Sequence, residues 1–227
     1  MIDHEHDLRL LRTATERLLT DVATLDNAAL AEPSRLPGWT RGHVLAHLAR
    51  NADALVNVFE GRPMYASAEQ RAADIERDAP RGADEQLADV RRTHDAFLAA
   101  TAVDQDWTRT VELRNGVTDS AAGVLFRRLA EIELHRVDLG IGYEPEDLPA
   151  EFTERYTTFL ADRFRGLGTA PTTLLRSTDG RIWTTGAGPG ALTVTGPAPA
   201  LLSWLAGRRD GSDLRVEGGP LPALPPL

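Results

Sequence analysis

The chain has 227 residues, of which 42% are hydrophobic and 26% are charged. This composition is typical of a folded globular protein, and the length predicts two domains because most domains run to about 100–200 residues. The formal net charge is −9, from 34 acidic and 25 basic residues, so there is no broad positive field to attract a phosphate backbone. Nucleic acid is therefore not expected as a partner.

The sequence contains no cysteine and no long apolar run. Without cysteine the chain cannot supply a thiolate nucleophile, a disulfide or a sulfur ligand, so any sulfur chemistry needs an external thiol. No segment approaches the roughly 18 apolar residues of a membrane span, and the first ten residues are acidic where a signal peptide is basic. We therefore expect a cytoplasmic location and no membrane partner.

Four helical stretches are predicted in the first two thirds of the chain. Apolar residues recur at helical spacing over residues 7–25, and Thr40 is a plausible N-cap for a second helix that ends near Glu60. A third stretch covers residues 68–102, with or without a break at APRGAD, and a fourth covers residues 119–139. Four helices with modest connections are typical of a helical bundle.

The residue pattern changes after Pro149. A fifth helix is predicted over residues 150–164, and TTLLRSTDGRIWTT predicts two strands joined at an Asp-Gly turn. ALTVTG alternates as a third strand, PAPALLSWLAGR predicts a helix opened by proline, and SDLRVEG predicts a fourth strand. The predicted fold class is α+β, with a helical bundle over residues 1–147 and a small α/β domain over residues 148–227.

Histidine and glutamate side chains on two of the predicted helices are the strongest candidates for chemistry. On the second helix, His47 lies at the flank of the inward apolar stripe, whereas His43 lies nearer its border. On the fourth helix, His135 lies beside the stripe and Glu131 just outside it, one turn apart on one face. A carboxylate and an imidazole at this spacing, faced by a histidine from a neighbouring helix, can bind one divalent ion.

Three protein ligands would leave a coordination position open for water or a thiol, as in catalytic zinc sites. Asp138 could orient a ligating imidazole from behind. Two alternatives remain for the ligand set, with His43 in place of Glu131 or with His94 joining from the third helix. A simpler explanation of the same pattern is a group of hydrogen-bonded histidines at the border of a core.

Other residues near these positions have more ordinary explanations. Trp39 and Arg41 open the second helix and could contact a ligand, but a tryptophan there more often packs the helix start onto the core. Asn51 could hydrogen-bond near the ion or be a satisfied buried amide. His4 and His6 lie near the chain end, where we expect them to be solvated.

LPGWTRGHVLAHLARNADAL closely resembles the signature of the mycothiol-dependent maleylpyruvate isomerases, and EIELHRVDLG resembles that family's second ligand motif. The resemblance covers nearly the whole chain, and the N-terminal part is similar to the wider DinB-like bundle superfamily. It implies that His47, Glu131 and His135 bind zinc or another divalent metal. It also implies a catalytic arginine at Arg208, which on its own would be interpreted as a solvated residue at a helix end.

The resemblance further implies mycothiol as a second cofactor and a small electrophile as the substrate. The metal would lower the pKa of the thiol, and the thiolate would add to the cis double bond of maleylpyruvate, permit rotation and leave to give fumarylpyruvate. Arg208 would pair with a substrate carboxylate. A mycothiol S-transferase with the same ligands is the nearest alternative, and a non-enzymatic metal-binding regulatory bundle is a more distant one.

Overall fold

The computed structural model describes residues 3–103, 105–167, 171–186, 188 and 192–225. The chain divides into two units, Met1–Tyr143 and Glu144–Leu227. Within the described ranges, no helix is both long enough and apolar enough to cross a membrane.

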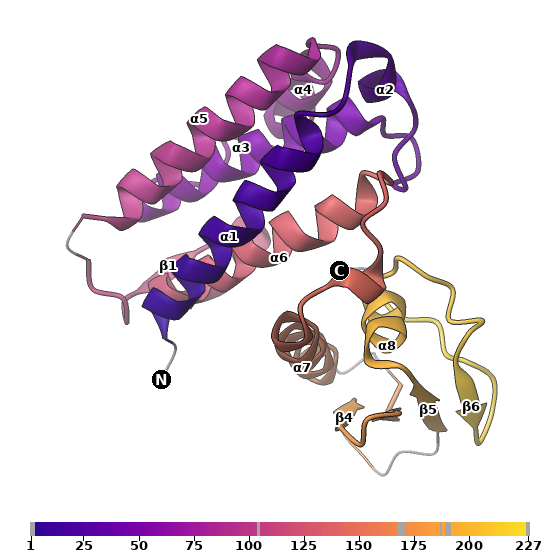
Figure 1. The fold of residues 1–227 in the computed structure, drawn as a ribbon. Helices are drawn as coiled ribbons and strands as arrows, with labels where there is room; N and C mark the ends of the chain where they lie inside the picture. The colour runs from indigo at the N-terminus through magenta and orange to yellow at the C-terminus, as the bar shows by residue number, and fades with distance from the viewer. Residues whose placement is uncertain (1–2, 104, 168–170, 187, 189–191, 226–227) are drawn as a thin grey trace. The chain divides into compact units, whose positions relative to one another are not determined.

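Four long helices build the first unit (Figure 1). They are α1 (His4–Val22), α3 (Arg41–Phe59), α5 (Ala83–Thr101) and α6 (Ala121–Asp138). Helix α3 contacts α5 and α6, and α1 contacts the same two helices, so the four helices enclose a common core. The predicted helical bundle is confirmed.

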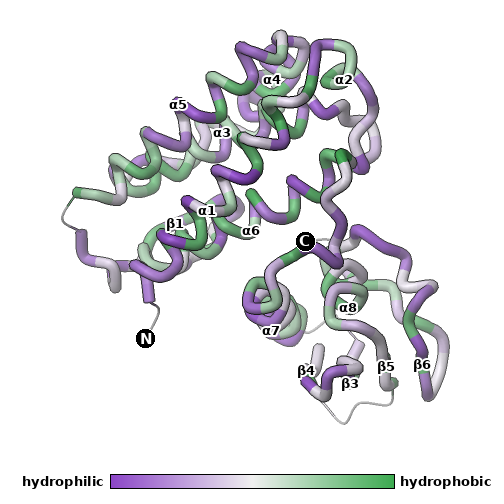
Figure 2. Tube along the Cα trace, in the orientation of Figure 1, coloured by the Kyte–Doolittle hydropathy of each residue, from purple (hydrophilic) through white to green (hydrophobic). Residues whose placement is uncertain are grey.

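The bundle core follows from the periodicity of these four helices. Figure 2 shows hydrophobic and hydrophilic stretches alternating along α1 and α5, as expected for helices with one buried face. Helices α3 and α6 bury a larger share of their residues, including the fully buried Leu45 and Leu125. Functional side chains on α3 and α6 are therefore held by packing on several sides.

Shorter elements connect the bundle helices. The break at APRGAD is real, because α4 (Ala68–Asp78) ends before α5 begins. Four short elements of this unit were not predicted, because they are too short to show a period. They are α2 (Asn27–Ala31) and a hairpin of β1 (Thr110–Glu112) and β2 (Thr118–Ser120), whose strands are joined by the 3-10 turn η1 (Arg114–Gly116).

Helix starts are fixed by side-chain caps. In α3, the side chain of Thr40 accepts a hydrogen bond from the backbone of His43, and His43 Nδ1 accepts one from the backbone N–H of Thr40. This reciprocal pair confirms Thr40 as the predicted N-cap. His43 occupies the third helical position, which glutamate or glutamine commonly fills in such a capping box. Helix α1 begins earlier than predicted, capped by Asp3, and His4 stacks on Trp107 instead of being solvated.

Gly42 sets how closely α4 approaches α3. A Cβ atom at this position would lie 2.3 Å from the carbonyl oxygen of Ala79, just beyond the end of α4. Gln86 closes the same junction, because its buried amide donates to the carbonyls of Gly42, Asp78 and Ala79. The sequence thus tolerates a glycine inside α3 so that α4 can pack directly against its first turn.

The second unit is a small four-stranded sheet with two helices. Its strand order is β4-β3-β5-β6, in which β3 and β5 are parallel and the other neighbours are antiparallel. The elements are η2 (Pro145–Asp147), α7 (Ala150–Leu167), β3 (Thr173–Ser177), β4 (Ile182–Thr185), β5 (Leu192–Gly196), α8 (Ala198–Leu205) and β6 (Arg215–Glu217).

The elements predicted for this unit are present. Strands β3 and β4 form the predicted hairpin, and Gly180 has the positive φ of 93° that its turn requires. Helix α7 packs against β4 and α8, and α8 packs against β3 and β5. Buried Leu175 and Val194 pair with each other at the centre of the sheet. The predicted α+β fold class is confirmed.

Candidate metal centre

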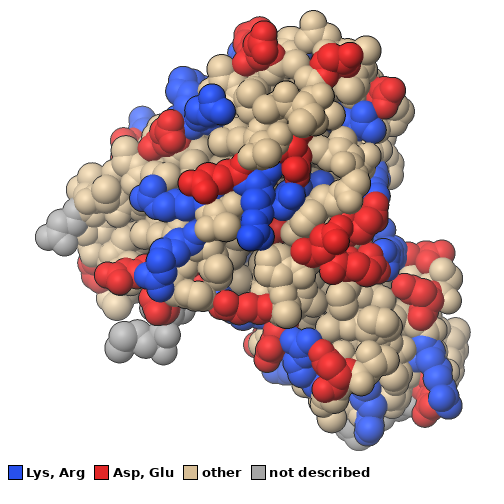
Figure 3. Space-filling view, viewed as in Figure 1, with Lys and Arg blue, Asp and Glu red and all other residues tan. Residues whose placement is uncertain are grey.

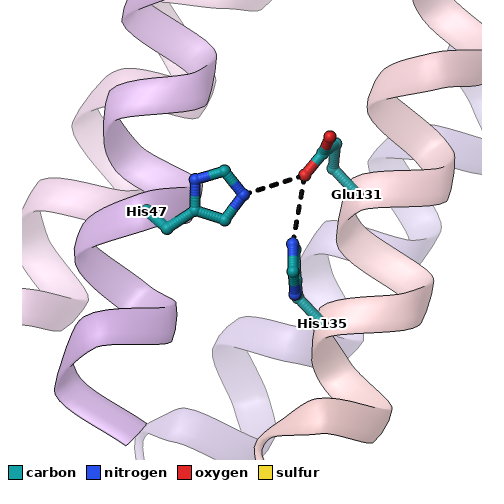
Figure 4. A group of neighbouring side chains, drawn as sticks. All are labelled: His47, Glu131 and His135. Atoms are coloured by element: carbon teal, nitrogen blue, oxygen red, sulfur yellow. Dashed lines mark hydrogen bonds and ion pairs between the residues drawn. The ribbon is translucent and has the colours of Figure 1, made fainter. Parts of the chain in front are cut away.

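His47, Glu131 and His135 converge between two bundle helices (Figure 4). His47 comes from the middle of α3, and Glu131 and His135 lie one turn apart on α6. Glu131 Oε2 is 3.0 Å from His47 Nε2 and 3.2 Å from His135 Nε2. One ligand atom of each residue lies within 4.8 Å of the others, a spacing that a single divalent ion can bridge with little adjustment.

The three side chains differ in their access to solvent. His47 and His135 are buried, with 6% and 8% of their surface exposed, whereas the side chain of Glu131 is 34% exposed. The imidazole rings lie edge to face, with centroids 4.7 Å apart. The candidate centre therefore has two buried histidines and is exposed to solvent on the side of the carboxylate.

Asp138 fixes the orientation of His135. Its Oδ2 lies 2.8 Å from His135 Nδ1, and its side chain is fully buried. A buried carboxylate favours a proton on the nitrogen that faces it, which leaves Nε2 of His135 directed towards Glu131. This is the arrangement of a carboxylate behind a ligating imidazole that the sequence suggested for Asp138.

The surroundings of the three side chains set their charge at neutral pH. Burial lowers the pKa of His47 to about 4, so its ring is neutral. Burial also acts to raise the pKa of Glu131, but hydrogen bonds from His135 and His47 outweigh it and hold that pKa well below its usual value. For His135, hydrogen bonds to Asp138 and Glu131 outweigh burial and raise its pKa.

A neutral imidazole, a carboxylate and a second imidazole backed by a carboxylate form a chemically suitable set for a divalent ion. His135 would lose its Nε2 proton when an ion binds, since metal and proton compete for the same lone pair. The donor atoms present thus fit a zinc-like ion.

The two alternative histidines do not join this group. His43 is engaged in the α3 cap and its Nε2 lies 3.3 Å from Glu76. His94 is buried on α5, and burial followed by the charges of Arg128 and Arg12 lowers its pKa to about 4. Neither belongs to the convergent group found among the described residues.

The other residues singled out at the start of α3 have structural contacts. The Trp39 ring packs beside His47, with centroids 5.6 Å apart. Arg41 donates to the carbonyls of Leu139 and Ala29 and pairs with Glu32, so its guanidinium ties α3 to α2 and to the end of α6.

Further along α3, the amide of Asn51 is buried and paired. Its Oδ1 accepts a hydrogen bond from Arg128 Nη1 at 2.8 Å. The same nitrogen of Arg128 also donates to the carbonyl of Leu48. Asn51 is therefore a satisfied buried amide that anchors a buried arginine of α6.

Sequence reasoning missed Arg71, which touches the candidate centre from α4. Its Nη2 lies 3.1 Å from His47 Nδ1. Helix α4 is mostly exposed, so an arginine there reads as an ordinary surface residue. No local pattern could have revealed this contact, because it depends on how α4 packs against α3.

Arg208 belongs to the second unit. It follows α8, where its backbone N–H donates to Ser203 and its Nη1 donates to the carbonyl of Ala206. The neighbouring Arg209 pairs with Glu146 through both Nη atoms. The catalytic role of Arg208 stays a prediction.

The fold and the convergent histidines and carboxylate define a helical-bundle protein with a candidate divalent-metal centre and an appended α+β unit. Residues 11–140 match the family model described as the mycothiol maleylpyruvate isomerase N-terminal domain, and residues 147–226 match the model described as the MDMPI C-terminal domain. The chain belongs to the mycothiol maleylpyruvate isomerase family.

Two solved structures are similar to the whole chain. One is the crystal structure of the mycothiol-dependent maleylpyruvate isomerase, at 25% identity with a TM-score of 0.90, covering 99% of this chain and 97% of that one. The other is a histidine-to-alanine mutant of a protein of the same name, at 25% identity with a TM-score of 0.89 and the same coverage. A comparison with curated protein sequences gave no match.

Proposed function

We propose that this protein is a metal-dependent, mycothiol-using isomerase that converts maleylpyruvate into fumarylpyruvate. The observation that carries the proposal is the convergence of His47, Glu131 and His135 on one point with an open side. Family membership and the likeness to the maleylpyruvate isomerase structures over nearly the whole chain support the same activity.

Each residue of the centre has a distinct part in this proposal. His47, Glu131 and His135 would hold a divalent ion, and Asp138 would keep His135 in the ligating orientation. The ion would supply a lowered thiol pKa, and mycothiol would supply a nucleophile whose reversible addition to the double bond permits rotation. The chain has no cysteine, so the sulfur must come from this external thiol.

Arg208 is proposed as the partner of a substrate carboxylate. An arginine can bind a carboxylate through two parallel N–H groups, which fixes the orientation of the substrate as well as attracting it. The need for such a residue is clear, because a chain with a formal charge of −9 repels a dianion at long range.

The proposal is tested by measuring metal content and activity on the same preparations. Zinc is quantified by mass spectrometry in the wild type and in His47→Ala, and maleylpyruvate isomerisation is then assayed with and without mycothiol. We expect about one zinc per chain in the wild type, loss of zinc in the variant, and isomerisation only with both zinc and thiol. An Arg208→Met variant should retain zinc and lose most of the activity.

Other outcomes separate the alternatives. Zinc binding with consumption of thiol and electrophile, but without isomerisation, would identify a mycothiol S-transferase. Wild-type protein that neither contains zinc nor gains activity on zinc addition would overturn the metal-dependent proposal and favour a non-enzymatic bundle.

A further inference from the structure

The two ring nitrogens of His47 face partners of opposite hydrogen-bonding character. Nε2 lies 3.0 Å from the carboxylate of Glu131, and Nδ1 lies 3.1 Å from Nη2 of Arg71. An ionised carboxylate can only accept a hydrogen bond, and a guanidinium can only donate one. Without a metal, the ring proton of His47 must therefore be on Nε2, and Nδ1 must accept from Arg71.

This arrangement is incompatible with a metal on Nε2. Ligation needs the lone pair of that nitrogen, so the proton of the neutral ring must move to Nδ1. There it would face the N–H of Arg71, donor against donor, and the hydrogen bond would be lost. His135 has no such conflict, because Asp138 accepts from its Nδ1 with or without an ion on Nε2.

We propose that Arg71 is a metal-gated anion-binding residue: a divalent ion on His47 Nε2 displaces Arg71 from Nδ1, and the released guanidinium binds a carboxylate of the substrate. This inference rests on the proposed function, since it assumes a metal at this centre. Arg71 is thus assigned as a second carboxylate-binding residue, contributed by the bundle itself.

The surroundings of Arg71 suit a small anionic ligand. Arg71 is half-buried and lines a pocket of about 340 Å³, whose charged lining is Arg50, Arg71 and Arg77 against Asp53 and Asp74. Its guanidinium carbon lies 5.7 Å from the centroid of the Tyr65 ring, so an aromatic face supports the cation beside the pocket. A cavity of this size lies at the lower end of the range for small-molecule sites.

Local charge explains why the ligand would be an anion. A divalent ion and Arg71 together would bring three positive charges, against the one negative charge of Glu131 in the proposed ligand set. The two aspartates of the pocket, Asp53 and Asp74, are already paired with Arg50 and Arg77. Elsewhere on the first unit, acidic and basic side chains are interspersed on the face shown in Figure 3. A metal-loaded centre would therefore be a locally positive spot on a chain whose formal charge is −9.

The first test measures zinc affinity and the protonation of His47 directly. Arg71→Met removes the hydrogen bond that stabilises the His47 tautomer with its proton on Nε2, which cannot bind the metal. It also removes a positive charge that repels the metal ion. We expect zinc to bind more tightly by about three- to tenfold, the equivalent of one hydrogen bond. Nitrogen NMR of His47 should show the proton on Nε2 in metal-free wild type and on Nδ1 after zinc addition.

The matched control is Arg92→Met, because Arg92 is exposed on α5, is paired with Asp89 and is not one of the residues that line the pocket. It changes the net charge equally and should leave zinc affinity unchanged. Weaker zinc binding in Arg71→Met, with Arg92→Met unaffected, would mean that Arg71 supports the metal, and it would overturn the inference.

The second test uses succinate, an unreactive dicarboxylate, as the probe in calorimetric titrations. Zinc-loaded wild type should bind succinate at least about tenfold more tightly than zinc-loaded Arg71→Met, as expected for loss of a charge-assisted pair. Arg71→Lys, which keeps the charge without the planar fork, should fall between them. Metal-free wild type and metal-free Arg71→Met should differ little, since Arg71 is then occupied by His47.

The two proposals fail differently in these experiments. If wild type binds no zinc, the metal-dependent function fails and this inference fails with it. If zinc binds but succinate affinity is the same in wild type and Arg71→Met, only the role of Arg71 is overturned.

Discussion

Helix α3 carries two charged clusters only one turn apart, and they are built in opposite ways. Around His47, a carboxylate and two imidazoles converge, so electron-pair donors gather on one point. Around Arg50, positive and negative groups alternate. Arg50 pairs with Asp78, Asp89 and Asp53, which come from α4, α5 and α3.

The charges of the Arg50 cluster are paired within the protein, although Arg50 Nε is a buried donor without a hydrogen-bond partner. Asp78 is fully buried and is also paired with Arg77 and Arg81, and Asp89 is paired with Arg81 and Arg92. These pairs join three helices. The comparison teaches that charges with a structural role are paired with counter-ions from the protein, whereas a group of electron-pair donors with an open side has the composition to accept a cation from outside.

The largest effect is expected at the carboxylate of the candidate metal centre. Glu131→Gln keeps the side-chain shape but replaces an anionic ligand with a weak neutral one, so metal-dependent activity should fall by about 1000-fold, in line with several kcal/mol of metal assistance. Zinc content and activity are measured beside Glu76→Gln, an exposed glutamate near His43 that should behave as wild type. Full activity of Glu131→Gln would contradict the metal centre.

The next effect is on stability and not on metal binding. Asp78→Ala removes a fully buried partner of Arg50 and should cost about 3 kcal/mol of unfolding free energy, since a charge is left partly uncompensated. Urea denaturation measures this cost, with Asp74→Ala on the same helix as control for a more exposed pair. Zinc stoichiometry should be unchanged in both variants. Loss of zinc in Asp78→Ala without unfolding would show that the clusters are not independent.

A buried histidine outside both clusters gives a pH-dependent effect. The pKa of His94 is lowered to about 4 by burial and by nearby arginines. Below about pH 6.5, His94 is therefore protonated in the unfolded chain but stays neutral in the folded chain until the pH approaches 4. Its contribution to stability is therefore complete above about pH 6.5 and is lost progressively down to about pH 4. The total loss should be about 2–3 kcal/mol.

This dependence is isolated by comparing wild type with His94→Gln in urea at pH 7 and at pH 4.5. The difference between the two proteins should shift in favour of the variant at the lower pH. A difference that is equal at both pH values would rule out the neutral buried state of His94.

A smaller effect, on zinc affinity, is expected at Asp138, which hydrogen-bonds to the candidate ligand His135. Asp138→Asn keeps a hydrogen-bond acceptor for His135 but removes the negative charge, so zinc affinity should fall by about 10- to 100-fold. Competition with a chelator measures the change. Zinc stoichiometry at saturation should remain that of wild type, which distinguishes this variant from Glu131→Gln.

The smallest effect is at the start of α3. Thr40→Ala removes the side-chain half of the cap shared with His43 and should cost about 1 kcal/mol of unfolding free energy in urea, without changing zinc affinity. A clear loss of zinc affinity would indicate that the cap also positions His47.

Much of the fold could be predicted because helices and hairpins are local. The apolar periods gave α1, α3 and α6 to within a few residues and left open the break that separates α4 from α5. Thr40 marked the start of α3, and the Asp-Gly pair marked the β3–β4 turn. The pairing of β3 with β5 was not predictable in this way. A parallel pair joins strands through a crossover, and nothing in either strand's sequence specifies it.

The sequence by itself determined that Glu131 and His135 share one helix face and that the chain has no thiol of its own. Only the tertiary structure decided that His47, 84 residues before Glu131, would meet that carboxylate, that His43 would serve the α3 cap, and that Arg71 would reach His47. The physical reason is range: periodicity and capping act within a few turns, whereas a candidate site between helices depends on how whole helices pack.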